Sequence, residues 1–578
     1  MGLTKNSFNL FRPFFSLLLL SSVFCFGQNK SDLPGNVPHF NVGQLPHLEK
    51  HGTATRLVVE GTPFLLISGE LHNSATGGFA SMRPLWKKLE QRHLNSIIAP
   101  VSWELLEPEE GKFDFSQVDS LIAGARKANL KVVLIWFASW KNGGSTYIPS
   151  WVKKEYKKYP RAKDENDKPL EILSTFGKAS AEADAKAFSI LMRHVRETDS
   201  AQQTVVMVQV ENEVGVLNNL EKTPGSTRRD FSDPANAAYN GPVPHGFMNY
   251  LIAHKDNLNP ELYKVWGANG FKTSGSWEEV FGKGKYTPDQ NDFWHSFSYY
   301  TEELFMAWNY ATYIEEVMAA GKKEYPLPMY VNTWLRYATC YVPGKFPSGG
   351  PLPEVHDVWR AAAPSIDFFA PDIYSEEFGL VCKEYTKNGN PLFIPETVGY
   401  KIGAARAFYA FGEYNAGCFS PFGIDDPVDE KNDMLAESYE VLEKLSSVIL
   451  ENQGNGTMRG ILVDTSSRVQ KFEMGDYLIE ARLAGWQKLD VAGGLIIQMG
   501  KNSFIVAGRG IDVFFTPKDS SVSIGVDASD EGTFKDGKWI SERRLNGDEV
   551  HSSTWIGTGV HLPDSKVSVQ NFSLYQYK

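Results

Sequence analysis

The chain is poor in cysteine, and it lacks the short motifs that bind zinc or phosphate. Its 578 residues include only Cys25, Cys340, Cys382 and Cys418. Cys25 lies in an N-terminal segment that we expect to be removed, so at most one pair could form and no disulfide framework is expected. Cysteine and histidine nowhere have the spacing of a zinc site, and we predict no catalytic metal and no cofactor. A Gly-rich phosphate loop is also missing, which disfavours a nucleotide-using enzyme.

Positive charge is also scarce. Lys and Arg number 58 against 69 Asp and Glu, which gives a formal net charge of -11. Such a chain is a poor candidate for binding nucleic acid or anionic membrane surfaces. Hydrophobic residues make up 42% of the chain, enough for more than one domain with its own core. The 14 Trp could stack on sugars or fill cores, and composition does not choose between these roles.

The most apolar stretch lies at the N-terminus. Lys5 and Arg12 precede an apolar run over residues 14–24, and the small Gly27 follows it. This order is typical of a secretory signal peptide, with cleavage near residues 27–28. The run is too short to span a bilayer, and no second stretch is long enough. We therefore expect a periplasmic or extracellular protein without stable membrane insertion.

Eight strand-like segments alternate with helical patterns such as residues 181–197 and 301–320. The segments are residues 63–72, 95–104, 131–140, 204–215, 328–334, 365–374, 391–396 and 416–422. This alternation predicts an α/β fold, a (β/α)8 TIM barrel over residues 28–453 behind the signal peptide at 1–27. Short strands separated by Gly and Asp turns then predict a C-terminal β-sandwich over residues 454–578.

Most of these segments end in polar or aromatic side chains. In such a barrel the carboxyl ends of the strands converge on one opening, where catalytic groups lie. The fourth segment ends with Gln209, Glu211, Asn212 and Glu213. Other candidates for contact with a substrate at these ends are Glu70, His72, Glu104, Trp140, Asn332, Trp334 and Tyr374, together with the acidic Glu396.

Glu213 and Glu396 end the fourth and seventh strands, which face each other across a barrel. Retaining glycosidases need two carboxyl groups about 5–5.5 Å apart, one as nucleophile and one as acid/base. A hydrogen bond from Tyr374 would hold Glu396 ionised, and Asn212 could donate to a sugar 2-hydroxyl. Glu211 would point to the same side as Glu213 on a regular strand, so residue reasoning leaves either able to serve as the acid/base.

Three motifs resemble known glycosidase sequences. Residues 209–215 (Gln-Val-Glu-Asn-Glu-Val-Gly) resemble the acid/base motif of glycoside hydrolase family 35, the β-galactosidases. Residues 103–115 resemble the second-strand segment of that family, and residues 393–397 resemble the nucleophile segment of the wider clan. The resemblance implies Glu213 as acid/base, Glu396 as nucleophile, retention of configuration and terminal β-galactose as the sugar. It also makes Glu211 a structural group that binds backbone or an arginine.

The sequence departs from the familiar family pattern at several strand ends. Glu104 and Leu106 stand where the family has Asn and His, Ser139 stands where it has Glu, and Asn73 where it has Tyr. A sugar-reading carboxylate has thus moved from the third strand to the second. Divergent members with an added C-terminal β domain act on plant-polysaccharide side chains, such as the galactose of xyloglucan.

Three functions remain open at this point. The first is an exo-acting β-galactosidase, and the second is another retaining β-glycosidase of the same clan acting on glucosides, fucosides or galactofuranosides. The third is a glycan-binding protein without catalysis, since a barrel alone does not define a function. All three have a carbohydrate partner. The sequence leaves the aglycone, the linkage and the oligomeric state open and allows a homo-oligomer.

Overall fold

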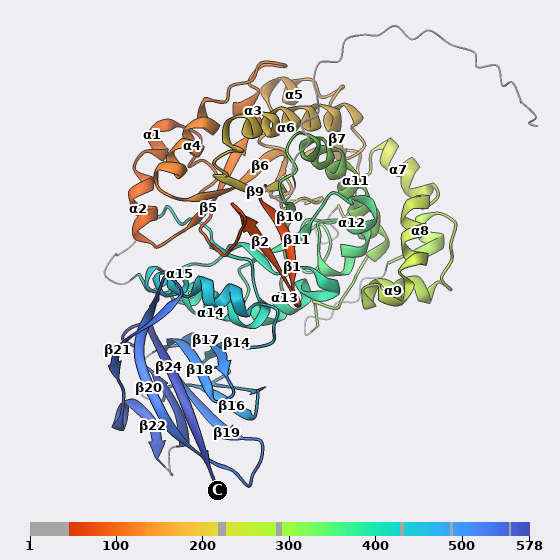
Figure 1. Ribbon diagram of the computed structural model, residues 1–578. Coiled ribbons are helices and arrows are strands. Elements are labelled where there is room, and N and C mark those ends of the chain that lie inside the picture. Colours follow the sequence, from red (N-terminus) through yellow and green to blue (C-terminus); the bar gives the residue numbers. More distant parts are fainter. Residues whose placement is uncertain (1–44, 218–226, 285–291, 428–432, 486–488, 554–556) are drawn as a thin grey trace, which may run out of the picture. The chain divides into compact units, whose positions relative to one another are not determined.

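A computed structural model describes residues 45–217, 227–284, 292–427, 433–485, 489–553 and 557–578 (Figure 1). The predicted signal peptide, residues 1–27, lies outside these described residues. Among the described helices, none is both long and apolar enough to cross a membrane.

Eight parallel strands form the barrel (Figure 1). They are β4 (Leu66–Ile67), β5 (Ser96–Ser102), β6 (Lys131–Lys141), β9 (Val205–Asn212), β10 (Met329–Trp334), β11 (Phe368–Ile373), β12 (Phe393–Thr397) and β13 (Cys418–Pro421). Each overlaps one of the eight segments predicted from the sequence. The ring closes between the first and second strands, where the Ile98 amide donates to the Gly69 carbonyl and the Leu71 amide donates to the Ile98 carbonyl, both at 3.0 Å. The predicted (β/α)8 architecture is confirmed.

Helices surround the strands and cover their outward-facing apolar side chains. The longer ones are α4 (Ser116–Lys127), α6 (Lys178–Asp199), α11 (Tyr300–Glu324), α13 (Phe378–Tyr385), α14 (Tyr400–Tyr414) and α15 (Met434–Asn452). Shorter ones are α1 (Phe79–Met82), α2 (Leu85–Gln91), α3 (Trp103–Leu106), α5 (Ser150–Lys154) and α12 (His356–Ala362). The apolar stripe of α6, with Phe188, Leu191 and Val195 at helical spacing, is buried as its periodicity predicts. The side chain of Asp433 caps α15 by accepting from the Ala436 amide at 3.1 Å.

The long connection between β9 and β10 forms its own helical layer. Its elements are α7 (Asp233–Asn240), α8 (His245–Ala253), α9 (Pro260–Ala268) and α10 (Trp277–Phe281), and the last begins with a capping box formed by Ser276 and Glu279. Two short strands, β7 (Arg161–Lys163) and β8 (Pro169–Leu173), form a hairpin after β6. Long connections of this kind commonly shape the rim of a barrel's active site.

The barrel interior is packed rather than hollow. Ile98, Ile135, Tyr330 and Phe393 belong to one buried cluster contributed by facing strands. An antiparallel sheet precedes the barrel and contains β1 (His47–His51), β2 (Ala54–Val59) and β3 (Thr62–Phe64). Its Leu57 and Val59 join the same interior cluster. The interior is therefore filled by side chains below the strand ends, as in other barrels of this size.

Two antiparallel sheets make up the C-terminal region. One contains β14 (Met458–Asp464), β17 (Val491–Gly500), β18 (Ser503–Arg509), β24 (Ser568–Tyr577), β20 (Ser523–Lys535) and β21 (Lys538–Arg544). The other contains β15 (Val469–Met474), β16 (Tyr477–Leu483), β19 (Ile511–Pro517), β23 (Gly557–Leu562) and β22 (Val550–Ser553). Phe504 of the first sheet and Phe515 of the second meet at 4.9 Å between ring centroids in a shared core. This is the predicted β-sandwich.

The β-sandwich packs directly on helix α14 of the barrel. Gly493 of β17 lies so close that a Cβ there would come within 2.2–2.6 Å of the backbone of Ala405. Arg459 of β14 also forms an ion pair with Glu413 at the end of α14, at 2.8 Å. Helix α15 ends at Asn452 and β14 begins at Met458. The predicted boundary at 453–454 falls in this connection and stays a prediction, because the two regions share buried contacts.

Candidate active site

Three carboxyl groups meet at the carboxyl ends of the barrel strands. Glu213 directly follows β9, Asp372 is the second-last residue of β11, and Glu396 lies in β12. One carboxylate oxygen from each lies within 4.8 Å of those of the other two, and all three side chains are buried. Asp372 is the register partner of Glu396 on the neighbouring strand. The structure thus brings together the two glutamates that the sequence singled out, and it adds Asp372 between them.

Glu213 is aimed into the barrel by an unusual backbone. Its φ is +48°, in the left-handed region that a side chain of this kind rarely adopts. Such a conformation costs about 1–3 kcal/mol and persists only where its surroundings hold it. Asn332 holds it here, because its Oδ1 accepts from the Glu213 amide at 2.9 Å while its Nδ2 donates to Asp372 at 2.7 Å. The structure therefore places Asn332 as a support for two of the three acids.

Tyr374 fixes one oxygen of Glu396. Its hydroxyl donates to Glu396 Oε1 at 2.5 Å, as the sequence analysis expected for these two residues. The second oxygen of Glu396 is buried and has no hydrogen-bond partner among the described residues. A carboxylate held by one donor, with its other oxygen free, is suited to attack an electrophilic carbon.

Burial raises the pKa values of both glutamates, and neighbouring groups modify that rise. Burial, and then the negative charge of Glu396, raise the pKa of Glu213 to about 8. Burial also raises the pKa of Glu396, but the Lys141 ammonium and the Tyr374 hydroxyl oppose that rise. Burial raises the pKa of Asp372 well above its usual range, helped by the charges of Glu396 and Glu213. With a pKa of about 8, Glu213 holds a proton near neutral pH and can still release it, as an acid/base group must.

Besides Asp372, sequence reasoning missed Lys141 as a residue of this site. It ends β6, is the register partner of Asn212 on β9, and is only 9% exposed. Its charge acts on Glu70, Glu213 and Glu396. The predicted third strand ended one residue earlier, at Trp140, so Lys141 counted as loop. A lysine directly after an apolar strand that ends at the barrel opening was the signal that could have found it.

The side chains of Glu70 and Asn212 are buried and have no hydrogen-bond partner among the described residues. Both oxygens of Glu70 and both polar side-chain atoms of Asn212 lack a hydrogen bond to any described residue. Buried polar groups are normally paired, so water or a ligand hydroxyl is the expected partner of these atoms. Burial and the charge of Glu396 both raise the pKa of Glu70, which places its carboxyl next to the central acids. The substrate contacts predicted for these two residues stay predictions.

Glu211 does not share the orientation of Glu213. Its φ is +62°, which breaks the alternation of a regular strand. Its carboxylate accepts from the amides of Ser139 and Trp140 at 3.1 and 2.7 Å and interacts with Asp184 of α6. The expectation that Glu211 would face the same side as Glu213 is wrong, while the interpretation of Glu211 as a backbone-binding structural group is confirmed.

Trp140 is not available to stack on a sugar. Its side chain is completely buried, its ring packs edge-on against Tyr310 and Tyr313 of α11, and its Nε1 donates to the Leu173 carbonyl. The strand is irregular between Trp136 and Lys141, and Trp140 belongs to the core that includes the surrounding helices. The prediction of Trp140 as a substrate-binding residue is therefore wrong. Trp334 ends β10 and is partly exposed, so its predicted contact stays open.

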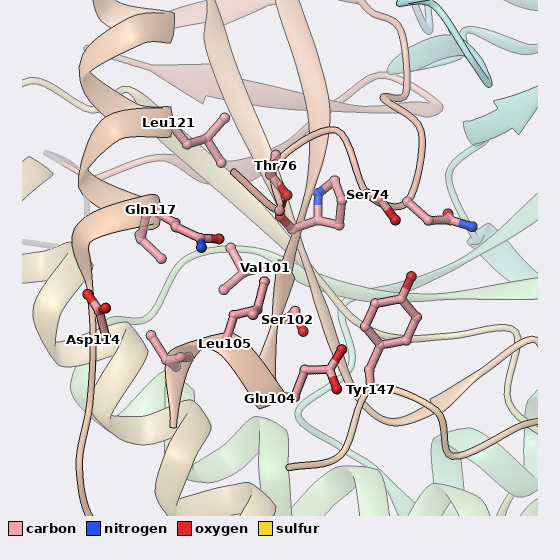
Figure 2. A pocket seen from close by; sticks show the side chains of 15 residues that line it. Ser74, Thr76, Val101, Ser102, Glu104, Leu105, Asp114, Gln117, Leu121 and Tyr147 are labelled. Atoms are coloured by element: carbon pink, nitrogen blue, oxygen red, sulfur yellow. Dashed lines mark hydrogen bonds between the residues drawn. The ribbon is translucent and has the colours of Figure 1, made fainter. Parts of the chain in front are cut away.

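His72 and Glu104 lie at the outer part of the barrel opening. His72 Nδ1 lies 3.0 Å from Asp425, and its ring meets Phe422 edge-on. Glu104 forms an ion pair with Lys153 at 3.1 Å and lines a pocket of about 90 Å³ with Tyr147 (Figure 2). Tyr147 packs on Phe137 at 4.9 Å, and Phe137 in turn lies 5.3 Å below the Lys141 ammonium. The predicted contact of Glu104 with sugar stays a prediction.

Two parts of the chain match known family models. Residues 81–315 match glycoside hydrolase family 42, described as Beta-galactosidase, and residues 435–557 match a domain of unknown function, DUF5597. The first match covers β5, β6 and β9 of the barrel, and the second covers α15 and most of the β-sandwich. The chain is β-galactosidase-like, and these matches support a glycoside hydrolase.

Individual relatives carry the same description. Human Beta-galactosidase-1-like protein 3 is 29% identical over 233 residues, 35% of this chain and 33% of the relative. A Beta-galactosidase of Xanthomonas manihotis is 30% identical over 172 residues, 28% of this chain and 25% of the relative. The chain thus spans a third or less of these relatives. The crystal structure of a beta-galactosidase from Bacillus circulans sp. alkalophilus is 14% identical, with a TM-score of 0.43 over 67% of this chain and 57% of that chain.

Proposed function

We propose that this protein is a retaining, exo-acting β-galactosidase that releases terminal non-reducing β-galactosyl residues from plant or algal oligo- and polysaccharides such as xyloglucan. The observation that carries the proposal is the pair of buried carboxyl groups of Glu213 and Glu396, with oxygens within 4.8 Å of each other at the barrel opening. This separation is compatible with direct nucleophilic attack, whereas inverting enzymes space their carboxyls about 6.5–9.5 Å apart to admit a water.

In the first half of the reaction, Glu396 attacks the anomeric carbon and the bond to the leaving oxygen breaks. Glu213 gives its proton to that oxygen, so the aglycone departs as an alcohol and a covalent galactosyl-enzyme forms. In the second half, Glu213 takes a proton from water, the water oxygen attacks the anomeric carbon, and Glu396 leaves as a carboxylate. Two displacements restore the starting configuration. Asn212 and Glu70 offer unpaired polar atoms to the sugar hydroxyls.

Replacing the two glutamates separately tests these roles. We expect Glu396→Ala to lower kcat/KM for 4-nitrophenyl β-galactoside by more than about 10³-fold, because the nucleophile is lost. Glu213→Ala should retain fast release of nitrophenol, which needs little protonation, but hydrolyse the galactosyl-enzyme slowly, and azide should restore turnover by forming β-galactosyl azide. Glu211→Gln is the matched comparison. Azide rescue in Glu211→Gln and not in Glu213→Ala would reverse the assignment.

Glycosyl transfer and hydrolysis of other sugars should be tested in the same assay. One relative, Beta-1,2-glucosyltransferase of Ignavibacterium album, is 26% identical over 194 residues. Ser139, where the familiar pattern has a sugar-reading Glu, also motivates a wider panel. We propose nitrophenyl β-glucoside, β-fucoside and β-galactofuranoside as alternatives, each with and without a sugar acceptor. Galactoside as the poorest substrate would refute the sugar assignment. Unchanged glycan binding with no turnover on any member would instead favour a non-catalytic glycan-binding protein.

We further propose that the protein is exported. The proposal rests on Lys5, Arg12 and the apolar run at residues 14–24. Expression of the full chain in a bacterial host, with N-terminal sequencing of the periplasmic product, would test it. Cleavage near residues 27–28 is expected, and retention of an intact N-terminus in the cytoplasm would contradict it.

A further inference from the structure

Two histidines and an aspartate meet on the five-stranded sheet of the β-sandwich, far in sequence from the catalytic pair. Asp512 lies in β19, His561 in β23 and His551 in β22, three strands that are consecutive in the sheet. Asp512 Oδ1 accepts from His551 Nε2 at 2.9 Å and from His561 Nδ1 at 2.7 Å. Because Ile511 and Val513 on either side of Asp512 belong to the sandwich core, Asp512 points to the opposite face of the sheet.

The cluster has the donor set and the rigidity of a metal site. One potential ligand atom from each of the three residues lies within 4.8 Å of those of the others. Two imidazole nitrogens and one carboxylate oxygen suit zinc and its neighbours, whereas calcium and magnesium require oxygen ligands. The side chains of His551, Asp512 and His561 are 11%, 13% and 22% exposed. They are thus held firmly by the sheet, yet an ion can still reach them from solvent.

The strand beside Asp512 carries one positive side chain. The nearest positive side chain on the adjoining strand is Arg482, the register partner of Asp512. Its guanidinium lies 4.8 Å above the Phe514 ring and donates to Glu480, so its charge is compensated away from Asp512. The His551 ring also stacks on the Phe514 ring, with 4.7 Å between the two centroids. The Phe514 ring therefore packs against one ligand ring and also against the Arg482 guanidinium.

We propose that Asp512, His551 and His561 bind one divalent ion of the zinc class, with a fourth position open to water. His551 would bind through Nε2 and His561 through Nδ1, each neutral ring carrying its hydrogen on its other nitrogen. The ion would fasten the edge strand β22, which pairs with β23 over only four residues, to both β23 and β19. The role is structural, and it is independent of the proposed hydrolase activity.

Titration of the full chain tests the proposal. After treatment with a chelator and its removal, Zn²⁺ added in a calorimeter should bind with a stoichiometry of one and raise the Tm. Co²⁺ should give the intense visible absorption of a four-coordinate site, and Zn²⁺ should abolish it. His551→Ala and His561→Ala should each weaken Zn²⁺ binding by more than about 100-fold, since loss of residues merely behind metal ligands costs about 10–100-fold.

His194→Ala is the matched control. His194 also pairs with one carboxylate, that of Asp119 at 2.6 Å, but among the described residues no second histidine joins the pair. This variant should bind Zn²⁺ and Co²⁺ as the unaltered protein does. Absence of a one-to-one isotherm and of the Co²⁺ band in the unaltered chain would overturn the proposal without any variant. Binding that survives both His551→Ala and His561→Ala, or that His194→Ala removes, would overturn it as well.

Discussion

Glu213 is useful as an acid only while it carries its proton, and its surroundings set where that proton is lost. Burial and the charge of Glu396 raise its pKa to about 8. In the proposed reaction kcat/KM should therefore be constant through neutral pH and fall as the pH rises through about 8, because this profile reports groups of the free enzyme. Stopped assays would measure this alkaline limb of the pH profile. They should use an unactivated galactoside, because protonation of the leaving oxygen then matters. A flat profile up to pH 10 would contradict the assignment of Glu213.

Lys141 has a separate and testable electrostatic role. Its ammonium lowers the pKa values of both Glu213 and Glu396 against the effect of burial. We expect Lys141→Met to shift both limbs of the pH profile of kcat/KM to higher pH, because both carboxyl groups then bind protons more tightly. Lys141→Arg keeps the charge and should leave the limbs near their original positions. If Lys141→Met lowers the rate but leaves both limbs of the pH profile at their original pH, Lys141 contributes only through packing.

Among the secondary-structure elements, strand β17 offers a clean test of how the sandwich meets the barrel. A Cβ on Gly493 would clash with the backbone of Ala405, whereas at Gly500 of the same strand the nearest atoms are 3.7–3.8 Å away in the Ser503 side chain. Overpacking of this kind costs about 1–3 kcal/mol, and more where only backbone could move. Gly493→Ala should therefore lower the free energy of unfolding by at least that amount in urea titrations, while Gly500→Ala should change it by less than about 0.5 kcal/mol. Equal effects of Gly493→Ala and Gly500→Ala would mean that Gly493 is not the point of close contact with Ala405.

Regular elements could be predicted from the sequence because their signals are local. The β-branched run ending at Val210 is strand β9, and the polar residues that follow it lie at the barrel opening. Side-chain direction was harder to predict where the backbone departs from regular geometry. Trp140 follows an irregular part of β6, and Glu211 and Glu213 both have positive φ, so neither alternation nor spacing could show that Trp140 and Glu211 turn to the helices. The Glu213 backbone is also held by Asn332, 119 residues later in the chain, which no local signal in the sequence could show.

At the scale of the whole molecule, the β-sandwich covers part of the barrel. Leu495 and Ile505 of the first sheet belong to the same buried cluster as Phe408 and Phe411 of helix α14. Burying an apolar side chain of this size contributes about 1.5–3 kcal/mol, so several such residues together amount to a large part of the stability of a domain. The barrel helices α14 and α15 therefore depend on the sandwich for their outer packing, even though the chain reaches the sandwich only after the eighth strand is complete.

Removing residues 454–578 should consequently damage a barrel whose catalytic residues are all intact. We expect the shortened chain to expose the apolar face of α14, to aggregate, and to lose activity with a lower Tm in calorimetry. Co-expression of residues 454–578 as a separate chain should restore soluble, active material, because the lost contacts are noncovalent. The matched control is a full-length chain cleaved by a protease at a site inserted between Asn452 and Met458, which should keep its Tm. A shortened chain that remains monomeric with unchanged Tm and kcat/KM would mean that the barrel is stable without the sandwich.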